Sequence, residues 1–276
     1  MRGFAPGHIT GFFSSAVHDD PLETGSRGAG IAIEDGVTVD VEEADLTVVV
    51  LEDDEVEFEP VERVLEMMSV EARVEIETDV PLGCGFGASG AAAVATGLAA
   101  NEVFGLELER SQVVSAAHVA DVESGTGLGD VVPQSLGGIV TRVEEGAPEL
   151  GTFGKIDHDE DDLIGYTVLG SLDTSDVLSD DETMERINEA GEEALDEVLR
   201  KPSVEGLIEV SWEFARETGL VTDEVETYVE EIENAGGVAS MAMLGETVFG
   251  VGGDGEEEDV FDETTRIDDE GARLLS

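Results

Sequence analysis

Positive charge is almost missing from this sequence. Thirteen basic residues stand against 67 acidic ones, and only Lys155 and Lys201 are lysines. Nucleic acids and anionic membranes are bound through basic patches, so this balance argues against both as partners. The formal net charge of −54 favours a protein adapted to salt, because repulsion among surface carboxylates is tolerable where the Debye length falls to roughly 3 Å, at about 1 M. We therefore expect a cytoplasmic protein of a halophile.

Cysteine is nearly absent too. Cys84 is the only one, which excludes an internal disulfide and a cysteine zinc cluster. The first residues lack the apolar core of a secretory signal peptide, which favours retention in the cell. In contrast, 41% of the 276 residues are hydrophobic, which argues against a disordered acidic chain and predicts one large domain or two lobes with cores of their own.

Charge is locally absent from three segments of this acidic chain, residues 80–101, 131–141 and 234–245. Because a halophilic surface is acidic, such segments indicate the interior or a binding site. A membrane span is the alternative for residues 80–101, which approach the roughly 20 residues that a span requires. The segment is rich in Ala and Gly and opens with Pro81, so we favour a loop and a buried helix.

Apolar periodicity predicts mostly strands before residue 80 and mostly helices after it. A division near residues 146–155 gives two lobes, residues 1–150 and residues 151–276. We expect Ser111 to cap the helix that follows it. The expected strands are 30–33, 37–41, 46–51, 73–78 and 163–170, with apolar segments at 238–244 and 247–251, and the expected helices are 61–68, 89–104, 111–122, 183–199, 204–218 and 223–233.

A glycine-rich segment, residues 81–93, follows a predicted strand and opens a predicted helix. Backbone amides and the helix dipole favour an anion in such a place. It is no Walker A loop, because no lysine follows the last glycine. Gly85, Gly87 and Gly90 also match the dinucleotide fingerprint, but Glu107, the acid at a suitable distance, lies in a short link between helices. A dinucleotide site and a purely structural glycine turn are the alternatives.

Two carboxylates near that loop in sequence are candidates for chemistry. Asp121 and His118 share a face of a predicted helix that is otherwise apolar. A buried carboxylate costs several kcal/mol unless it is paired or binds a metal, so Asp121 is better explained as a cation ligand than as surface charge. Glu123 is the competing candidate, and a solvent-facing Asp121 is the alternative. Asp130 ends the glycine run 124–130, which can bring its carboxylate to a substrate.

The glycine-rich loop resembles the phosphate-binding motif of the GHMP kinase superfamily, P-x-x-x-G-L-G-S-S-A. Ala88 stands at the first serine of the motif and Ser89 at the second. The resemblance implies ATP and Mg²⁺ as cofactors, with Ser89 and Asp121 as metal ligands, because hard oxygens suit a hard cation. It implies that Asp130 orients or deprotonates the attacking hydroxyl. The implied ATP-binding residues are Pro81, Gly83, Gly85, Phe86, Gly87, Ala88, Ser89 and Gly90.

Further motifs extend the resemblance over nearly the whole chain, at residues 4–13, 25–30, 124–130 and 239–245. Their order and spacing are similar to those of the archaeal pantoate kinase family. In the first motif His8 stands where a lysine is common, and the methionines of the last motif replace its usual glycines and predict core packing. The implied fold is α+β and two-lobed, with an N-terminal ribosomal-protein-S5-like α/β lobe and a C-terminal ferredoxin-like α+β lobe.

This resemblance implies a small-molecule kinase that phosphorylates the 4-hydroxyl of pantoate on the archaeal route to coenzyme A. The implied substrate-binding residues are Ser26, His118, Arg142 and Thr174. An ion pair of Arg142 with Glu144, and a core role for His118, are the alternatives. Other candidate functions are a GHMP kinase for homoserine, mevalonate or shikimate, a dinucleotide-binding oxidoreductase and a nonenzymatic nucleotide-binding regulator. The sequence leaves open whether the chain forms a homodimer.

Overall fold

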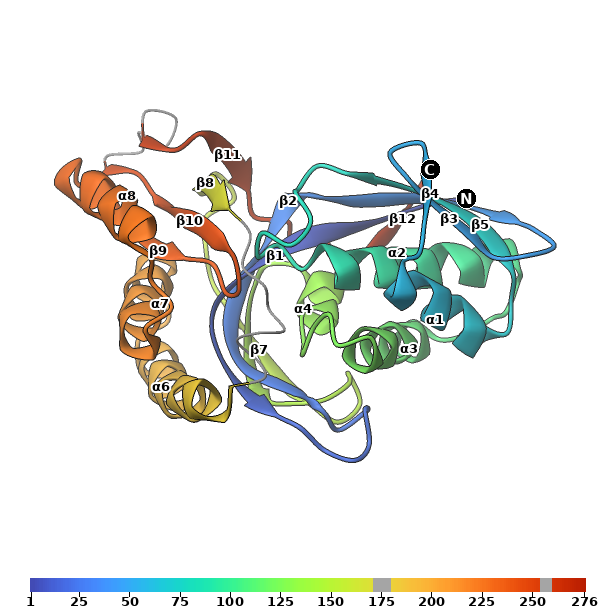
Figure 1. Ribbon diagram of the computed structural model, residues 1–276, viewed down its shortest axis with the longest axis horizontal. Coiled ribbons are helices and arrows are strands. Elements are labelled where there is room, and N and C mark those ends of the chain that lie inside the picture. Colours follow the sequence, from blue (N-terminus) through green and yellow to red (C-terminus); the bar gives the residue numbers. More distant parts are fainter. Residues whose placement is uncertain (171–179, 254–259) are drawn as a thin grey trace.

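The chain forms two β-sheets with helices on each (Figure 1), and this computed structural model describes residues 1–170, 180–253 and 260–276, without the side chain of residue 181. The larger sheet has eight strands in the order β12-β1-β2-β5-β3-β4, and β6 pairs with both β2 and β7. Its strands are β1 (Arg2–Ala16), β2 (Gly25–Glu43), β3 (Val48–Leu51), β4 (Asp54–Val56), β5 (Ala72–Thr78), β6 (Ile139–Glu144), β7 (Thr152–Ile156) and β12 (Arg273–Leu275).

The long strand β2 joins the parts of this sheet. It pairs with β1 along most of its length, with β6 through residues 28–31, and with β5 through residues 37–43. The separate strands expected at 30–33 and 37–41 are thus one strand. Register shifts in the β1–β2 pair, at Pro6/Gly7 and Thr10/Phe12, accompany the curvature that Figure 1 shows in these strands, since bulges bend a strand.

One face of the larger sheet is covered by α1 (Glu59–Met68), α2 (Ala88–Val103), α3 (Arg110–Glu123) and α4 (Val131–Leu136). The central helix α2 is buried on almost every side, as its small residues allow. A Cβ on Gly3 would lie 2.5 Å from the carbonyl oxygen of Ala95, which shows how closely β1 and α2 approach. The expected cap at Ser111 is wrong. The N-cap is Glu109, whose N–H donates to Gln112 Oε1 in a capping box.

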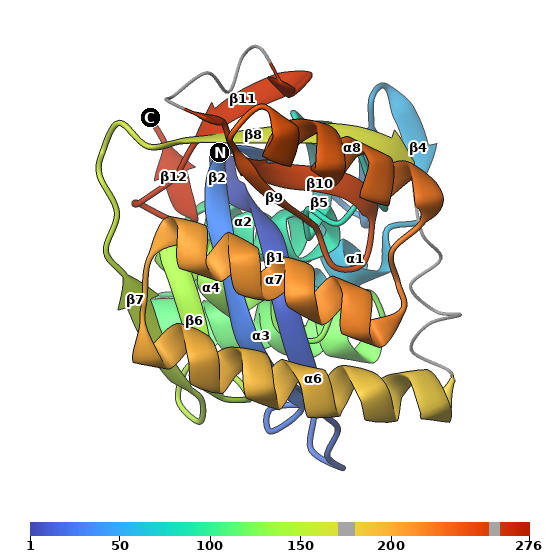
Figure 2. The same cartoon turned by 90° about the vertical axis from the view of Figure 1, so that its left-hand side faces the viewer.

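The smaller sheet has the order β11-β8-β10-β9 and is antiparallel throughout. Figure 2 shows α6 and α7 crossing in front of β1 and β2, where the ring of Phe214 packs against Phe12 and Phe13. This part contains β8 (Leu163–Gly170), α6 (Asp181–Arg200), α7 (Val204–Thr218), α8 (Asp223–Asn234), β9 (Val238–Met241), β10 (Glu246–Val251) and β11 (Glu263–Arg266).

The chain passes from the larger sheet to the smaller one between Ile156 and Leu163. The predicted division at residues 150 and 151 falls just before β7, which pairs with β6 in the larger sheet. The strand β12 returns from the smaller part to pair with β1. The β1–β12 pairing has no local sequence signal, because it joins the two ends of the chain, whereas β6 and β7 are consecutive strands.

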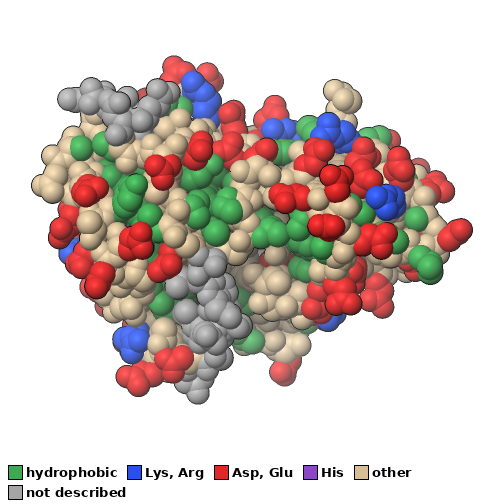
Figure 3. All heavy atoms as spheres, turned by 45° about the horizontal axis from the view of Figure 1, so that its top comes forward, with side chains coloured by type: hydrophobic (Ala, Val, Ile, Leu, Met, Phe, Trp, Pro, Cys, Tyr) green, Lys and Arg blue, Asp and Glu red, His purple; other side chains and the backbone are tan. Residues whose placement is uncertain are grey.

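Acidic side chains cover much of the molecular surface seen in Figure 3, with few Lys or Arg between them. Among the residues that the structure describes, no helix combines the length and the apolar character needed to cross a membrane. Residues 80–101, for which a span was the alternative, instead form the glycine-rich loop and α2.

Candidate active site

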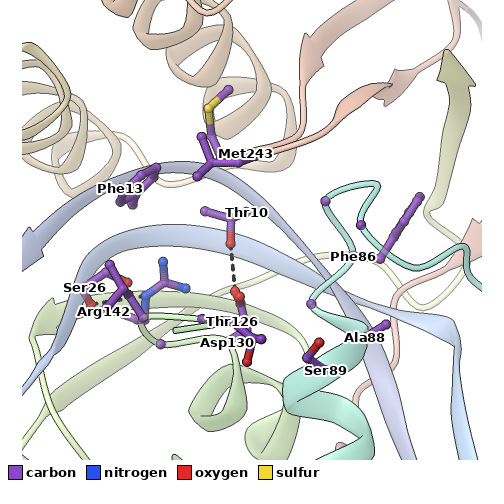
Figure 4. Close-up of a pocket in the computed structure, with 17 residues that line it drawn as sticks. Thr10, Phe13, Ser26, Phe86, Ala88, Ser89, Thr126, Asp130, Arg142 and Met243 are labelled. Carbon is purple, nitrogen blue, oxygen red and sulfur yellow. Dashed lines mark hydrogen bonds between the residues drawn. The ribbon is translucent and has the colours of Figure 1, made fainter. Parts of the chain in front are cut away.

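A pocket opens where the β9–β10 turn of the smaller part meets the larger sheet (Figure 4). The backbone N–H of Met243 in this turn donates to the carbonyl of Thr10 on β1, at 2.8 Å. Phe13 and Met243 lie on one side of the pocket, and Ser26, Arg142 and Asp130 on the other (Figure 4). The lining residues are Thr10, Phe13, Ser26, Gly83, Gly85, Phe86, Gly87, Ala88, Ser89, Thr126, Gly127, Leu128, Gly129, Asp130, Arg142, Met243 and Leu244.

The glycine-rich loop forms one end of this pocket and runs into α2. Gly87 is the N-cap of α2 with φ of 61°, a left-handed conformation that favours glycine. Gly87 has no side chain with which to cap the helix, so the first N–H groups of α2 are available to bind an anion. The loop is held from outside, by Gln134 Nε2 donating to the Gly87 carbonyl at 2.8 Å and Thr247 Oγ1 donating to the Cys84 carbonyl at 2.7 Å.

Six of the eight residues expected to bind ATP line the pocket. They are Gly83, Gly85, Phe86, Gly87, Ala88 and Ser89. The other two do not line it, since Pro81 is exposed and Gly90 is buried in the first turn of α2. Glu107, which a dinucleotide site would need, lies beyond the far end of the 16-residue helix α2, about 24 Å away at 1.5 Å per residue. The dinucleotide alternative therefore lacks its carboxylate.

Asp121 on α3 is buried behind the pocket, with 2% of its surface exposed. Thr126 Oγ1 donates to its Oδ1 at 2.7 Å. A Cβ on Gly127 would lie 2.1 Å from Oδ2, and one on Gly90 would lie 3.4 Å from it, so the carboxylate lies between the 124–130 run and the first turn of α2. Burial raises the pKa of Asp121 to about 7 although the Thr126 hydrogen bond opposes the rise.

Glu123, the competing carboxylate, lies elsewhere. It forms an ion pair with Arg63 at 3.0 Å, and 45% of its side chain is exposed. An exposed ion pair of this kind contributes little, and nothing brings Glu123 to the pocket. Of the two acids, only Asp121 lies against the glycine-rich loop.

Asp130 lines the pocket from the end of the 124–130 run. Its Oδ1 lies 2.8 Å from His8 Nδ1 and accepts a hydrogen bond from Thr10 Oγ1 at 3.0 Å (Figure 4). Burial alone would raise the pKa of Asp130, but the hydrogen bond with His8, the charge of Arg142 and the bond from Thr10 together bring it below its usual value. Asp130 is therefore ionised at neutral pH and can accept a hydrogen bond.

Arg142 on β6 brings a buried positive charge to the same pocket. Its Nε donates to the Ser26 carbonyl at 3.3 Å, and only 2% of its surface is exposed. Within residues 1–170, 180–253 and 260–276, its Nη1 has no hydrogen-bond partner. The expected alternative partner, Glu144, instead accepts a hydrogen bond from Thr152. A buried guanidinium N–H without a partner is costly, and a carboxylate ligand in the pocket would satisfy it.

The remaining residues expected to bind substrate differ in where they lie. Ser26 on β2 lines the pocket. His118 is buried and does not line it, and its Nε2 lies 2.9 Å from the carbonyl of Thr24. Burial lowers the pKa of His118, which favours a neutral ring. Thr174 lies outside the described residues.

Thr10, Phe13 and Leu244 line the pocket and His8 lies behind it beside Asp130, although none of these carried a predicted role. Met243, expected to pack in the core, is buried and also lines the pocket. A signal for β1 was present, because residues 3–17 contain no Asp, Glu, Lys or Arg. By the same argument that applied to residues 80–101, such a stretch indicates the interior or a site. No local pattern distinguishes the inward-facing residues of the β9–β10 turn from core residues.

The donor set fits a magnesium ion that also binds phosphate. In the described part of the chain, no group of three His, Cys, Asp or Glu side chains could hold a metal. Magnesium, however, keeps several waters and is held by one or two protein oxygens together with substrate phosphates. The Asp121 carboxylate lies against the first turn of α2, where Ser89 presents its hydroxyl to the pocket.

Comparison with known proteins agrees with this geometry. Residues 58–138 match the model of the GHMP kinases N terminal domain. The chain is 36% identical to the pantoate kinase of Methanocaldococcus jannaschii, over 89% of this chain and 90% of that one. It is 33% identical to the pantoate kinase of Thermococcus kodakarensis, over 94% and 89%.

Among solved structures, a phosphotransferase related to the CoA biosynthesis pathway superimposes with a TM-score of 0.89 at 29% identity, over 99% of this chain and 98% of that one. The expected two-lobed GHMP kinase fold is confirmed. The chain belongs to the pantoate kinase family of GHMP kinases.

Proposed function

We propose that the chain transfers the γ-phosphoryl group of ATP to the hydroxyl of pantoate and forms 4-phosphopantoate for coenzyme A synthesis. The observation that carries this proposal is the buried Arg142 guanidinium, whose Nη1 has no hydrogen-bond partner among the described residues. It lies in the same pocket as the N-terminus of α2 and an ionised Asp130. Pantoate has a carboxylate at carbon 1 and the acceptor hydroxyl on carbon 4. The pocket offers a group of matching chemistry for each, beside a phosphate site.

The phosphates of ATP bind the N–H groups of the glycine-rich loop and the first turn of α2. Ser89 and Asp121 hold Mg²⁺, which neutralises phosphate charge when it is bound. This role explains why a carboxyl group with a pKa raised to about 7 lies buried behind the loop. The Asp121 carboxyl would favour its ionised form beside a bound cation, and the cost of its burial would be offset in the loaded enzyme.

The acceptor lies at the opposite end of the pocket. Its carboxylate pairs with Arg142 and contacts Ser26, and its hydroxyl donates a hydrogen bond to Asp130. This bond orients the hydroxyl oxygen for attack on the γ-phosphorus, which breaks the bond to the β–γ bridging oxygen and releases ADP, while the hydroxyl proton leaves to Asp130 or to water. His118 supports the acceptor site indirectly, because it binds the carbonyl of Thr24 two residues before Ser26.

ADP formation in molar KCl, measured against pantoate, homoserine, mevalonate and shikimate, tests this function. We expect turnover with pantoate and little with the others. Turnover with homoserine but not pantoate would assign the chain to another GHMP activity. Omitting magnesium should abolish turnover with every substrate that the enzyme phosphorylates.

A further inference from the structure

We infer that His8 is the positioning residue for Asp130, holding one oxygen of the carboxylate through a neutral ring N–H so that the other is presented to the acceptor hydroxyl. This inference rests on the role of Asp130 in the proposed function. It gives a functional role to a residue that stands where a lysine is common in the family.

The backbone of Asp130 is held as the N-cap of α4, where its carbonyl accepts the N–H of Gln134 at 3.0 Å, but these main-chain contacts do not orient its carboxylate. Asp130 follows a segment in which Gly125, Gly127 and Gly129 alternate with other residues, and glycine permits many backbone conformations. Two bonds from β1 hold the carboxylate instead, from His8 and from Thr10, and both reach Oδ1. Oδ2 is thereby left for the hydroxyl of the acceptor.

The ring of His8 is held in place itself. Only 1% of the residue is exposed. On β2, a Cβ on Gly30 would lie 2.5 Å from His8 Nε2, so the strand backbone packs directly on the ring. The backbone N–H of His8 donates to the Phe86 carbonyl at 2.8 Å. His8 therefore binds the glycine-rich loop through its main chain and the Asp130 carboxylate through its side chain, which sets the spacing between the two ends of the pocket.

The surroundings determine which nitrogen carries the proton. Nε2 is buried against Gly30 and has no hydrogen-bond partner among the described residues. A proton there would be a buried donor without an acceptor, which is costly. Nδ1 faces the Asp130 carboxylate and is the nitrogen that donates. The charged groups acting on the ring are Asp130 and Arg142, and burial lowers the pKa of His8 despite the carboxylate, in keeping with a neutral ring.

A double-mutant cycle with His8→Ala and Asp130→Asn tests this inference, with kcat and the KM values for ATP and pantoate as readouts. We expect His8→Ala to lower kcat by about tenfold to a hundredfold, as misplacement by about 1 Å can do, with little change in the KM for ATP. In the Asp130→Asn background the same change should cost less than about threefold, because its effect passes through Asp130. An equal loss in both backgrounds would overturn the inference.

A matched pair of variants covers the case in which His8→Ala fails to fold. His8→Asn places an N–H near the position of Nδ1, whereas His8→Gln reaches toward Nε2 and Gly30. We expect the Asn variant to recover most of kcat and the Gln variant to recover little. Equal kcat values for the two would contradict a role at Nδ1. Wild-type kcat in Asp130→Asn alone would instead refute the assigned role of Asp130, and so distinguishes failure of the proposed function from failure of this inference.

Discussion

The two ends of the pocket are built in different ways. The phosphate end is one continuous stretch, residues 83–89, and it offers mainly backbone N–H groups. The acceptor end combines side chains from β1, β2, β6 and the segment before α4, from Thr10 to Arg142. A change at the phosphate end should therefore act through backbone shape and space, and a change at the acceptor end through the loss of one chemical group.

The largest effect is expected at Asp121, which serves the phosphate end although it is a side chain. Asp121→Asn removes the carboxylate that we propose holds magnesium and should lower kcat/KM by about a thousandfold or more, as loss of a main electrostatic group can. The same variant should be more stable than the wild type without magnesium at pH 8. The burial that raises the pKa from 3.8 to about 7 corresponds to about 4 kcal/mol, at about 1.36 kcal/mol per pKa unit.

The sign of this stability effect follows from proton linkage. Between about pH 4 and about pH 7 the unfolded chain loses the Asp121 proton while the folded chain keeps it, so wild-type stability falls with pH and levels off above that window. The advantage of Asp121→Asn should thus be larger at pH 8 than at pH 6 in denaturant unfolding in molar KCl. A variant less stable than the wild type at both pH values would contradict a destabilising burial of the Asp121 carboxylate.

Arg142→Ala should raise the KM for pantoate by about 10-fold to 150-fold, since a hydrogen bond to a charged group contributes about 1.5–3 kcal/mol. The KM for ATP should change little, because the residue lies at the acceptor end. Arg27→Ala is the matched control. Arg27 pairs with Glu192 and the carbonyl of Val143 and does not line the pocket. Equal effects of the two substitutions on pantoate binding would remove the assigned role of Arg142.

Gly87→Ala probes backbone shape at the phosphate end. The new Cβ would lie 3.0 Å from Gln134 Nε2 and 3.1 Å from Asp130 Cβ, at a residue with φ of 61°. We expect the KM for ATP to rise about tenfold, because the loop must shift. Gly105→Ala has a similar φ of 57° with nothing within 4 Å of the new Cβ. Gly105→Ala should lose about 1 kcal/mol of stability and keep the KM for ATP. If the KM for ATP rose equally in both variants, backbone strain and not the shape of the phosphate loop would be the cause.

The smallest effect is expected for Glu123→Gln. This acid pairs with Arg63 at the surface, so kcat should stay within about twofold and stability within about 0.5 kcal/mol of the wild type. The measurement separates it from Asp121, two residues earlier on the same helix. A large loss of magnesium-dependent activity in Glu123→Gln would reverse the assignment of the two acids.

Sequence patterns predicted the helices, strands and loops that are determined by residues close together in the chain. The helix expected at 204–218 and the strand at 163–170 agree with α7 and β8 at both ends. The glycine-rich loop was found because main-chain anion binding needs consecutive residues of particular types. The acid at the end of a flexible glycine run was also visible, since Asp130 follows three glycines.

Long-range pairings could not be predicted in this way. Nothing near His8 indicates that Asp130, 122 residues later, meets its ring. The return of β12 to β1 and the exposure of Met243 to the pocket also depend on tertiary structure. The N-cap of α3 was predicted wrongly for a different reason. Glu109 and Ser111 are both candidate N-caps, and the reciprocal hydrogen bonds between Glu109 and Gln112 decide between them.

Because β12 pairs in the larger sheet, the smaller part of the chain is connected to that sheet at both of its ends, through β7 before it and β12 after it. A protease cut between β7 and β8 would therefore not release it, because Arg2, Gly3 and Phe4 still pair with the last strand. The Met243 backbone bond to Thr10 is a further attachment, at the pocket itself. Removing the four-stranded part by truncation would also strip β1 of a neighbour and open the edge of the first sheet.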